Sequence, residues 1–520
     1  MAAKANADNA KSAFAELGMA ATVKAICDEI RELYLWDEIP WVIGYSGGKD
    51  SSAVLQLVWL AIRELPVEQR RKPIHVISTD TLVEQPLVSA WVDASHLKMR
   101  KAAEEQDMPI TPHKLMPEVK DTFWVNLIGK GYPAPRKLFR WCTSRMKINP
   151  SNTFILNVVR ESGEAILVLG TRKAESQRRE RNMLKHEAKK VRDRLTPNAS
   201  LPNSLVYTPV EDWTNDDVWL FLMQVKNPWG HTNKSLLGMY QGASADGECP
   251  LVVDSSTPSC GTSRFGCWVC TVVDKDRSME AMIKNDDEKV WMTPLLELRN
   301  ELGDFSQDRS RRDYRRMHGH VDLFGKDPNN QEIIRGPYTK KYREHWLRRV
   351  LEAQSLARRL GPPEFAGLEL ISLPELHEVR RIWLYEKHEF DDSLPRIYEE
   401  ATGEKFETEA ADDSPLRGDD WQILRDVCGD DEAFFELQAG LLDTERKFRG
   451  MSRRAGIYEA LEDRLKIGQF DNEQEALAIR REEERRRREA DGEVVPTVQK
   501  SLFEVVELDV IELEETELVP

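Results

Sequence analysis

The fold class is predicted from twelve consecutive residues, Trp41-Val-Ile-Gly-Tyr-Ser-Gly-Gly-Lys-Asp-Ser-Ser52. The first five predict a buried strand, and Ser52–Ile62 has a helical pattern. The glycines between them allow the backbone to approach an anion closely. The first amides of the helix point toward that anion, where the helix dipole favours negative charge. The stretch therefore predicts a phosphate-binding loop between a strand and a helix.

Two further stretches, Ile74-His-Val-Ile-Ser78 and Ala165-Ile-Leu-Val-Leu169, also predict buried strands, with helical patterns between them. Residues 11–36 carry apolar side chains at helical spacing and predict an amphipathic helix. Strands that alternate with helices are typical of a parallel, doubly wound sheet. We therefore expect an α/β fold, followed by a cysteine-rich segment and a mainly helical C-terminal region.

Composition excludes some classes of protein. Of the 520 residues, 40% are apolar and 32% are charged, as in globular proteins. No apolar run approaches the roughly 18 residues that span a bilayer, and no apolar signal segment follows Met1. A cytoplasmic protein without a membrane contact is expected. The net charge of −16 is uneven, because residues 471–520 supply −9 whereas residues 172–194 carry +6. A polyanion could meet the basic part.

The loop Tyr45–Ser52 matches neither GxxxxGK[ST] nor GxGxxG. It resembles the PP-loop, SGGxDS, of the ATP pyrophosphatases, whose fold is of the adenine nucleotide alpha hydrolase-like type. The resemblance implies binding of ATP with Mg²⁺, cleavage between the α and β phosphates, and adenylation of a substrate. The alternative is an ordinary Gly-Ser turn. The nucleotide-binding residues implied are Tyr45, Ser46, Gly47, Gly48, Lys49, Asp50, Ser51 and Ser52.

Further matches lie at the ends of the other two predicted strands, in Thr79-Asp80-Thr81 and Leu169-Gly-Thr-Arg-Lys-Ala-Glu-Ser176, and downstream in Val206-Tyr-Thr-Pro-Val-Glu-Asp-Trp213. Over residues 38–225 the series resembles the phosphoadenosine phosphosulfate (PAPS) reductase branch of the PP-loop superfamily. The resemblance adds Asp80 and Gly170 to the nucleotide site. Arg172 suits a phosphate clamp, because guanidinium binds phosphate oxygens bidentately, although a plain surface arginine is the alternative. The catalytic residues expected are Lys49, Asp50 and Arg172.

Four of the seven cysteines fall between Cys249 and Cys270, which points to metal or redox chemistry. Cys260, Cys267 and Cys270 can reach one centre, and the fourth ligand is Cys142 or Cys249. Thiolates suit zinc as well as a 4Fe-4S cluster, and a set of buried thiols without metal is the third alternative. Related reductases carry a cluster-binding cysteine at the point where Cys142 stands. The resemblance therefore implies a 4Fe-4S cluster on Cys142, Cys260, Cys267 and Cys270. Cys27 and Cys428 are expected in the core.

Three classes of sulfur-handling enzyme compete. A PAPS reductase proper needs a Glu-Cys-Gly-x-His element, which does not occur here, and tRNA thiolation enzymes with a cluster usually have two CxxC pairs. Gly247-Glu-Cys-Pro250, Thr257–Asp276 and Arg335-Gly-Pro-Tyr-Thr-Lys-Lys-Tyr-Arg-Glu-His-Trp346 resemble the DndC family of DNA phosphorothioation sulfurtransferases. That resemblance implies DNA as substrate, a cysteine desulfurase as sulfur donor, and other DNA phosphorothioation subunits as partners. A nucleotide-binding scaffold with structural zinc is the non-enzymatic rival.

Organisation along the chain follows from these features. We expect an N-terminal helix (1–37), a PP-loop domain (38–241), a cysteine-rich and basic segment (242–347), a helical domain (348–470) and a charged helix with an acidic tail (471–520).

DNA contacts are predicted at residues 172–194, 309–316 and 335–349, where Tyr338, Tyr342 and Trp346 interleave with cations; solvated helix faces are the alternative. The tail 503–520 alternates acidic and aliphatic residues, which suits docking to a partner or a solubilising role.

Overall fold

The structure is a computed structural model in which the chain divides into two compact units. The first comprises Met1–Phe305, Arg343–Trp383 and Asp392–Thr408, and the second comprises Ser306–Tyr342, Leu384–Asp391 and Glu409–Pro520. The residues described are 11–175, 180, 181, 183, 184, 194–198, 200–243, 265–317, 319–325, 327, 330–387, 389, 391–407, 418–429, 431–449, 451, 453–467, 470 and 472–490.

The first unit contains the predicted α/β domain. Its strands are β1 (Trp41–Gly44), β2 (Ile74–Thr79), β3 (Ile110–Leu115), β4 (Ala165–Val168), β5 (Thr196–Pro197) and β6 (Ser204–Tyr207). Its helices are α1 (Gly18–Trp36), α2 (Lys49–Arg63), α3 (Pro86–Glu105), α4 (Asn149–Ser162), α6 (Asn215–Gln224), α7 (Asn233–Gly242), α8 (Arg277–Asn285) and α9 (Thr293–Gly303), followed by most of α11 (Lys340–Leu360), most of α12 (Leu373–Tyr385) and α13 (Ser393–Thr402).

The six strands form one sheet in the order β3-β2-β1-β4-β6-β5, and all neighbours but the β5–β6 pair are parallel. The chain moves outward from β1 to β2 and β3, and then crosses to β4 on the other side of β1. The strand order therefore reverses between β1 and β4. In open α/β sheets, ligands bind outside the carboxyl ends of the strands at such a switch point. The predicted fold class is confirmed.

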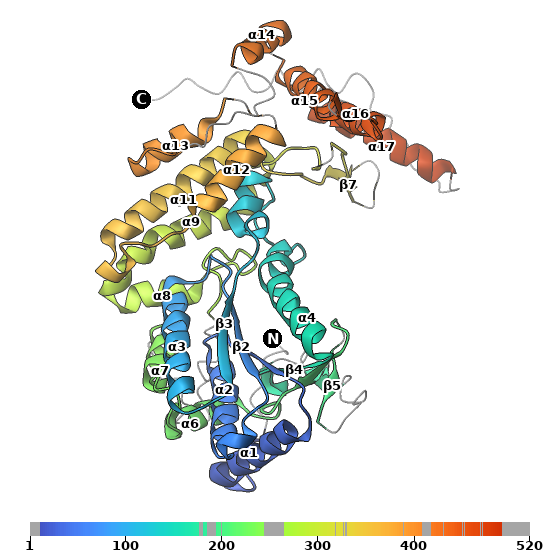
Figure 1. Ribbon diagram of the computed structural model, residues 1–520. Coiled ribbons are helices and arrows are strands. Elements are labelled where there is room, and N and C mark those ends of the chain that lie inside the picture. The colour runs from blue at the N-terminus through green and yellow to red at the C-terminus, as the bar shows by residue number, and fades with distance from the viewer. Residues whose placement is uncertain are drawn as a thin grey trace, which may run out of the picture. The chain divides into compact units, whose positions relative to one another are not determined.

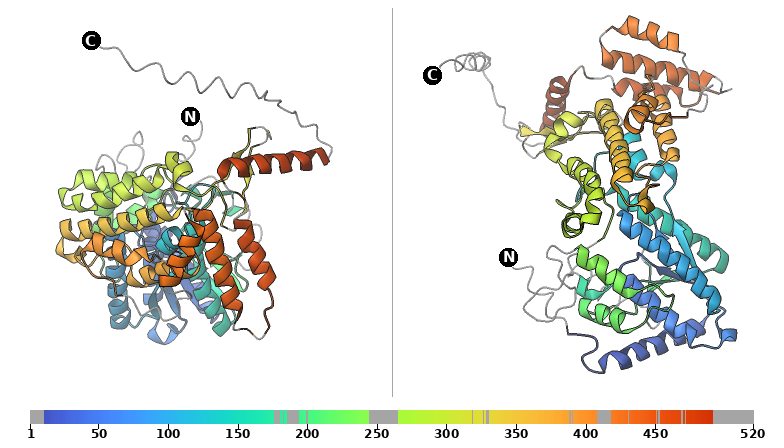
Figure 2. Two further views of the ribbon diagram at one scale, coloured as in Figure 1. Left: turned by 90° about the horizontal axis from the view of Figure 1, so that it is seen from above. Right: turned by 90° about the vertical axis from the view of Figure 1, so that its left-hand side faces the viewer.

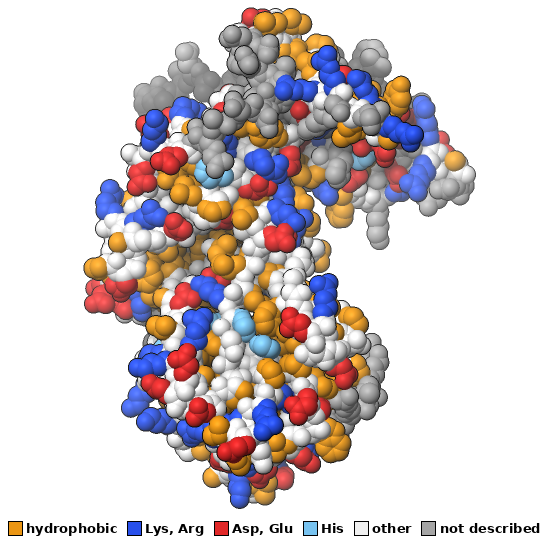
Figure 3. Space-filling view, in the orientation of Figure 1, with side chains coloured by type: hydrophobic (Ala, Val, Ile, Leu, Met, Phe, Trp, Pro, Cys, Tyr) orange, Lys and Arg blue, Asp and Glu red, His pale blue; other side chains and the backbone are white. Residues whose placement is uncertain are grey.

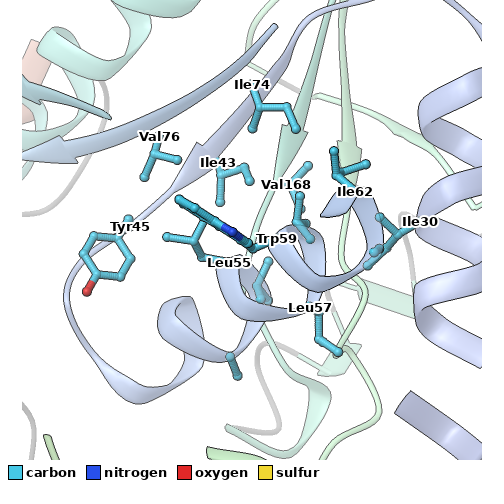
Figure 4. Packing of buried hydrophobic residues seen from close by; sticks show 14 of the residues in the cluster. Ile30, Ile43, Tyr45, Leu55, Leu57, Trp59, Ile62, Ile74, Val76 and Val168 are labelled. Atoms are coloured by element: carbon cyan, nitrogen blue, oxygen red, sulfur yellow. The ribbon is translucent and has the colours of Figure 1, made fainter. Parts of the chain in front are cut away.

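Helices cover both faces of this sheet, and Figure 1 shows α3 and α4 on opposite sides of it. On the face that α2 covers, Ile43, Val76 and Val168 surround Trp59, which is fully buried (Figure 4). The other face packs α4 against the strands, with Ile155 among the buried residues. Because both faces are covered, the adjacent strands β1 and β4 contain no polar side chain apart from the indole of Trp41, as the sequence pattern indicated.

Sequence patterns missed three strands. β3 has the sequence Ile-Thr-Pro-His-Lys-Leu, which contains a proline and little apolar alternation. It lies at the edge of the sheet, where Pro112 costs no ladder hydrogen bond on the open side. β5 has only two residues, too few for a periodic signal, and β6, Ser-Leu-Val-Tyr, is not a continuous apolar run. The helix predicted over residues 11–36 begins only at Gly18.

The last helices of the first unit pack on a segment that precedes α4. Trp124 Nε1 donates to the carbonyl of Leu370 at 2.6 Å, and Trp383 Nε1 donates to that of Ile128 at 3.0 Å. Both indoles are buried, so each needs its partner. Residues far apart in sequence thus share one apolar cluster, and the predicted domain boundaries stay predictions.

The second unit contains α10 (Asp308–Arg311), β7 (Leu323–Phe324), β8 (Glu332–Ile333), α14 (Gly418–Cys428), α15 (Glu432–Arg449), α16 (Ile457–Ile467) and α17 (Glu473–Ala490). The short strands β7 and β8 pair antiparallel, and α15 packs beside α16 (Figure 2). A small core forms around Val321, Phe470 and Ala476. None of the helices in the described part of the chain has the length and apolar character needed to cross a membrane.

Candidate active site at the carboxyl edge of the sheet

The predicted phosphate loop lies where the strand order reverses. It leaves β1 and enters α2, whose N-cap is Gly48, a residue in extended conformation. Gly48 has no side chain that could cap this helix, and the first-turn amide of Lys49 donates to the Tyr240 hydroxyl at 3.4 Å. Ser51 Oγ donates to the carbonyl of Gly48 at 3.1 Å and lies 3.2 Å from Ser46 Oγ. These contacts shape the loop around an uncapped helix N-terminus, which is a favourable place for an anion.

Gly47 is required at its position for two reasons. Its φ is +73°, which an L side chain rarely adopts. A Cβ there would also lie 2.6 Å from Val92 Cγ2 and 3.2 Å from Trp91 Cδ1. Trp91 Nε1 donates to the carbonyl of Gly47 at 3.1 Å, and its ring stacks on that of His231 with centroids 3.6 Å apart. The loop therefore rests on a rigid aromatic support that the sequence did not indicate.

Asp50 links the loop to the segment that follows β4. Its carboxylate accepts from Arg172 Nε at 2.7 Å and lies 3.1 Å from Lys49 Nζ. Arg172 also donates to the carbonyl of Trp213, and its side chain is 4% exposed. A Cβ on Gly170 would lie 2.9 Å from the backbone of Asp50. The predicted residues Lys49, Asp50, Gly170 and Arg172 are thus brought together, and Arg172 is not a plain surface arginine.

Two other predicted nucleotide residues have supporting positions. The ring of Tyr45 is buried in the core (Figure 4), its hydroxyl lies 2.8 Å from Ser95 Oγ, and burial raises its pKa. Asp80, after β2, accepts from the amide of Leu82 at 2.8 Å and lies 2.9 Å from Lys114 Nζ. Neither pattern could be read from the sequence, because the partners belong to other elements.

Three of the predicted metal-binding cysteines lie in one neighbourhood. Cys267 Sγ lies 3.3 Å from Thr81 Oγ1, just beyond β2, and burial raises the pKa of this thiol to about 11. Burial also raises the pKa of Cys142, and the charge of Cys270 raises the pKa of both thiols further. The three side chains therefore share one electrostatic environment at the same sheet edge as the loop.

The metal itself is not shown. Within the described residues no group of three or more His, Cys, Asp or Glu is positioned to hold an ion. Cys249 and Cys260 lie outside the described residues, so the choice of fourth ligand is a prediction still. The donor set of thiols fits a thiophilic centre, because soft thiolates select zinc and iron–sulfur clusters. Cys27 and Cys428 are buried in core positions, as expected.

The predicted DNA-binding stretches differ from their expected roles. Tyr338 and Trp346 are 3% and 0% exposed, so these rings cannot stack on a base in this structure. Arg312 is buried and donates to the carbonyl of Gly336 and to Asp308. The protein therefore uses these side chains for its own packing and hydrogen bonds. Most of residues 176–193, and the tail 503–520, lie outside the described residues.

Part of this chain is similar to known proteins. Residues 40–272 match the phosphoadenosine phosphosulfate reductase domain. The chain therefore contains a PAPS reductase-like domain of the PP-loop superfamily. It is also similar to an uncharacterized protein of Methanocaldococcus jannaschii, MJ0066, with 24% identity over 262 residues. The match covers 50% of this chain and 42% of that protein, so the chain spans less than half the length of this relative.

Proposed function

We propose that this chain is an ATP-dependent sulfurtransferase that adenylates a DNA backbone phosphate and helps to replace a non-bridging oxygen with sulfur. One observation carries the proposal: the phosphate loop after β1 and the thiol site beside β2 lie at the carboxyl edge of neighbouring strands. The activated phosphate and the sulfur could therefore meet without a long transfer. The match to a sulfur-handling family supports this reading.

The residues of the loop supply the chemistry of activation. A phosphodiester oxygen leaves poorly, so attack of that oxygen on the α-phosphorus of ATP makes an adenylate and expels pyrophosphate. The first-turn amides of α2 and Lys49 would stabilise the negative charge that develops on the departing pyrophosphate. Asp50, fixed by Arg172, would hold Mg²⁺, which neutralises phosphate charge when bound. Sulfur at the sulfide level would then attack the activated phosphorus, so that a P–S bond forms as the bond to the departing AMP breaks. Sulfur delivered as a persulfide would first need two electrons from a thiol reductant.

The thiol site would keep that sulfur. Cys142, Cys267 and Cys270, with Cys260, would hold a 4Fe-4S cluster, which protects and presents sulfur when bound. The raised pKa values of Cys142 and Cys267 mean that the metal-free thiols are protonated at neutral pH. Loading would therefore release protons. A cysteine desulfurase would supply sulfur, and further DNA phosphorothioation subunits would choose the DNA site.

The product of the reaction tests the proposal. The full chain, purified anaerobically, would be combined with a cysteine desulfurase, other DNA phosphorothioation subunits, ATP and DNA. Nuclease digestion and mass spectrometry should detect phosphorothioate-linked dinucleotides, and the Ser46→Ala variant should yield none. Thiolated nucleosides from tRNA, or sulfite released from PAPS, would assign the same loop to another substrate and overturn the DNA proposal.

A further inference from the structure

A short hairpin immediately before Cys142 presents an exposed apolar tip. Arg136 and Phe139 exchange both backbone hydrogen bonds at 3.0 Å, with Lys137 and Leu138 between them. Leu138 is 101% exposed and Phe139 is 44% exposed. Two large apolar side chains on a closed two-residue turn cannot retreat into a core, so this hairpin of residues 136–139 holds them in solvent.

The hairpin lies in a stretch without negative charge. Residues 122–160 contain seven Lys and Arg and no Asp or Glu, in a chain of net charge −16. Lys137 and Arg140 flank the tip, and neither forms an ion pair with a residue that the structure describes. On the face that Figure 3 shows, basic and acidic side chains are otherwise interspersed. A segment of uniform positive charge is therefore a local exception.

The base of the hairpin is fixed to the candidate site. The carbonyl of Pro135 accepts from Thr271 Oγ1 at 2.7 Å, next to Cys270. Arg136 lies over the ring of Phe305 at 4.2 Å, and Trp141 Nε1 donates to the carbonyl of Pro133 at 2.9 Å. These contacts leave the tip little freedom, so a ligand that binds it pays a small entropic cost. They also set it beside the thiols.

We propose that the 136–139 hairpin is a DNA contact in which Leu138 wedges against a base step while Lys137 and Arg140 bind the flanking phosphates. The inference rests on the proposed function, and it names the surface that would bring the DNA backbone to the candidate active site. Apolar wedges with flanking cations are a recurrent means of gripping and bending a duplex in its minor groove. DNA is favoured over a protein partner because every charged residue of the segment that carries the tip, residues 122–160, is positive.

The test measures binding of the full chain to a labelled DNA duplex of about 20 base pairs, two helical turns, by fluorescence anisotropy across a range of salt. Leu138→Ala should weaken binding about tenfold, because a buried leucine side chain contributes on this scale. It should leave the salt dependence unchanged. Lys137→Gln with Arg140→Gln should reduce the slope of log K against log salt by about 2, one unit for each lost phosphate contact.

Matched controls lie on α3 of the same unit, where Leu97 is 68% exposed and the Lys101 side chain is 78% exposed. Leu97→Ala and Lys101→Gln should bind as the wild type does. If the wild type binds but the hairpin variants match these controls, the hairpin inference is wrong and the DNA substrate survives. If the wild type shows no salt-dependent binding, the proposed function fails first. If Leu138→Ala keeps DNA binding yet loses a co-expressed subunit, the tip is a protein contact.

Discussion

The phosphate loop and the thiol site share one sheet edge but are built differently. The loop consists of consecutive residues, Ser46–Ser52, on supports that fix its shape. The thiol site is assembled from three segments, near Thr81, Cys142 and Cys267, that only the fold brings together. A loop of this kind depends on backbone conformation, whereas an assembled site depends on the packing between elements. Substitutions should therefore affect the two regions through different physical causes.

The largest effect is expected in the loop. Gly47→Ala forces an L side chain to φ +73° and drives its Cβ into Val92. Misplaced amides lose the phosphate, so pyrophosphate release should fall about 100-fold or more. Gly163→Ala is the control, since its φ is +83° but a Cβ there meets no atom within 4 Å. The Gly163→Ala variant should lose about 1 kcal/mol of free energy of unfolding and should release pyrophosphate as the wild type does. Equal losses would show that strain alone matters.

At the thiol site, replacement of any one ligand should remove the metal completely. Replacing Cys142, Cys267 or Cys270 by Ser should remove iron and acid-labile sulfide from anaerobic protein, because serine is a poor ligand for a thiophilic centre. Cys27→Ser and Cys428→Ser, in buried positions elsewhere, should retain both. Cys260→Ser should behave as a ligand variant. Bleaching by Cys249→Ser with full retention by Cys142→Ser would reverse the choice of fourth ligand.

An intermediate effect is expected where the loop meets β4. Arg172→Gln leaves Asp50 without its buried partner and should lower the free energy of unfolding by about 2–3 kcal/mol, measured in urea. Lys173→Gln removes an exposed ion pair with Asp212 and should cost under about 1 kcal/mol. If the two variants are equally stable, Arg172 does not anchor the loop.

Part of this comparison could be predicted from sequence and part could not. The loop and the three predicted strands could be recognised from the sequence because each is a local pattern, whereas the set of cysteine ligands is still a prediction. The hydrogen bond from Trp91 to Gly47 and the one from Arg172 to Asp50 could not be predicted, because the partners are distant in sequence. Tyr338 and Trp346 were predicted to stack on bases but are buried. Interleaved aromatic rings and cations also describe an amphipathic helix beside a core, which is the case for Trp346 in α11, whereas Tyr338 precedes that helix and pairs with Arg312 through the backbone.

An effect that is absent at neutral pH is a pH dependence away from both sites. Burial raises the pKa of Cys27 from 9.0 to about 11. The folded state therefore keeps the proton more tightly than the unfolded state. The stability this provides is complete below pH 9 and is lost as pH rises toward 11, by up to about 2–3 kcal/mol. The stability difference between wild type and Cys27→Ala should narrow over that range in chemical denaturation. A constant difference would contradict the raised pKa.

The central claim, that the loop Ser46–Ser52 is an ATP pyrophosphatase site, is tested most directly by the products of ATP turnover. Full-length anaerobic protein would be incubated with ATP labelled at the γ-phosphate, with and without DNA, and the products separated. We predict AMP and labelled pyrophosphate in equal amounts, absent in Ser46→Ala and in Asp50→Ala. Release of ADP and labelled inorganic phosphate would contradict the claim.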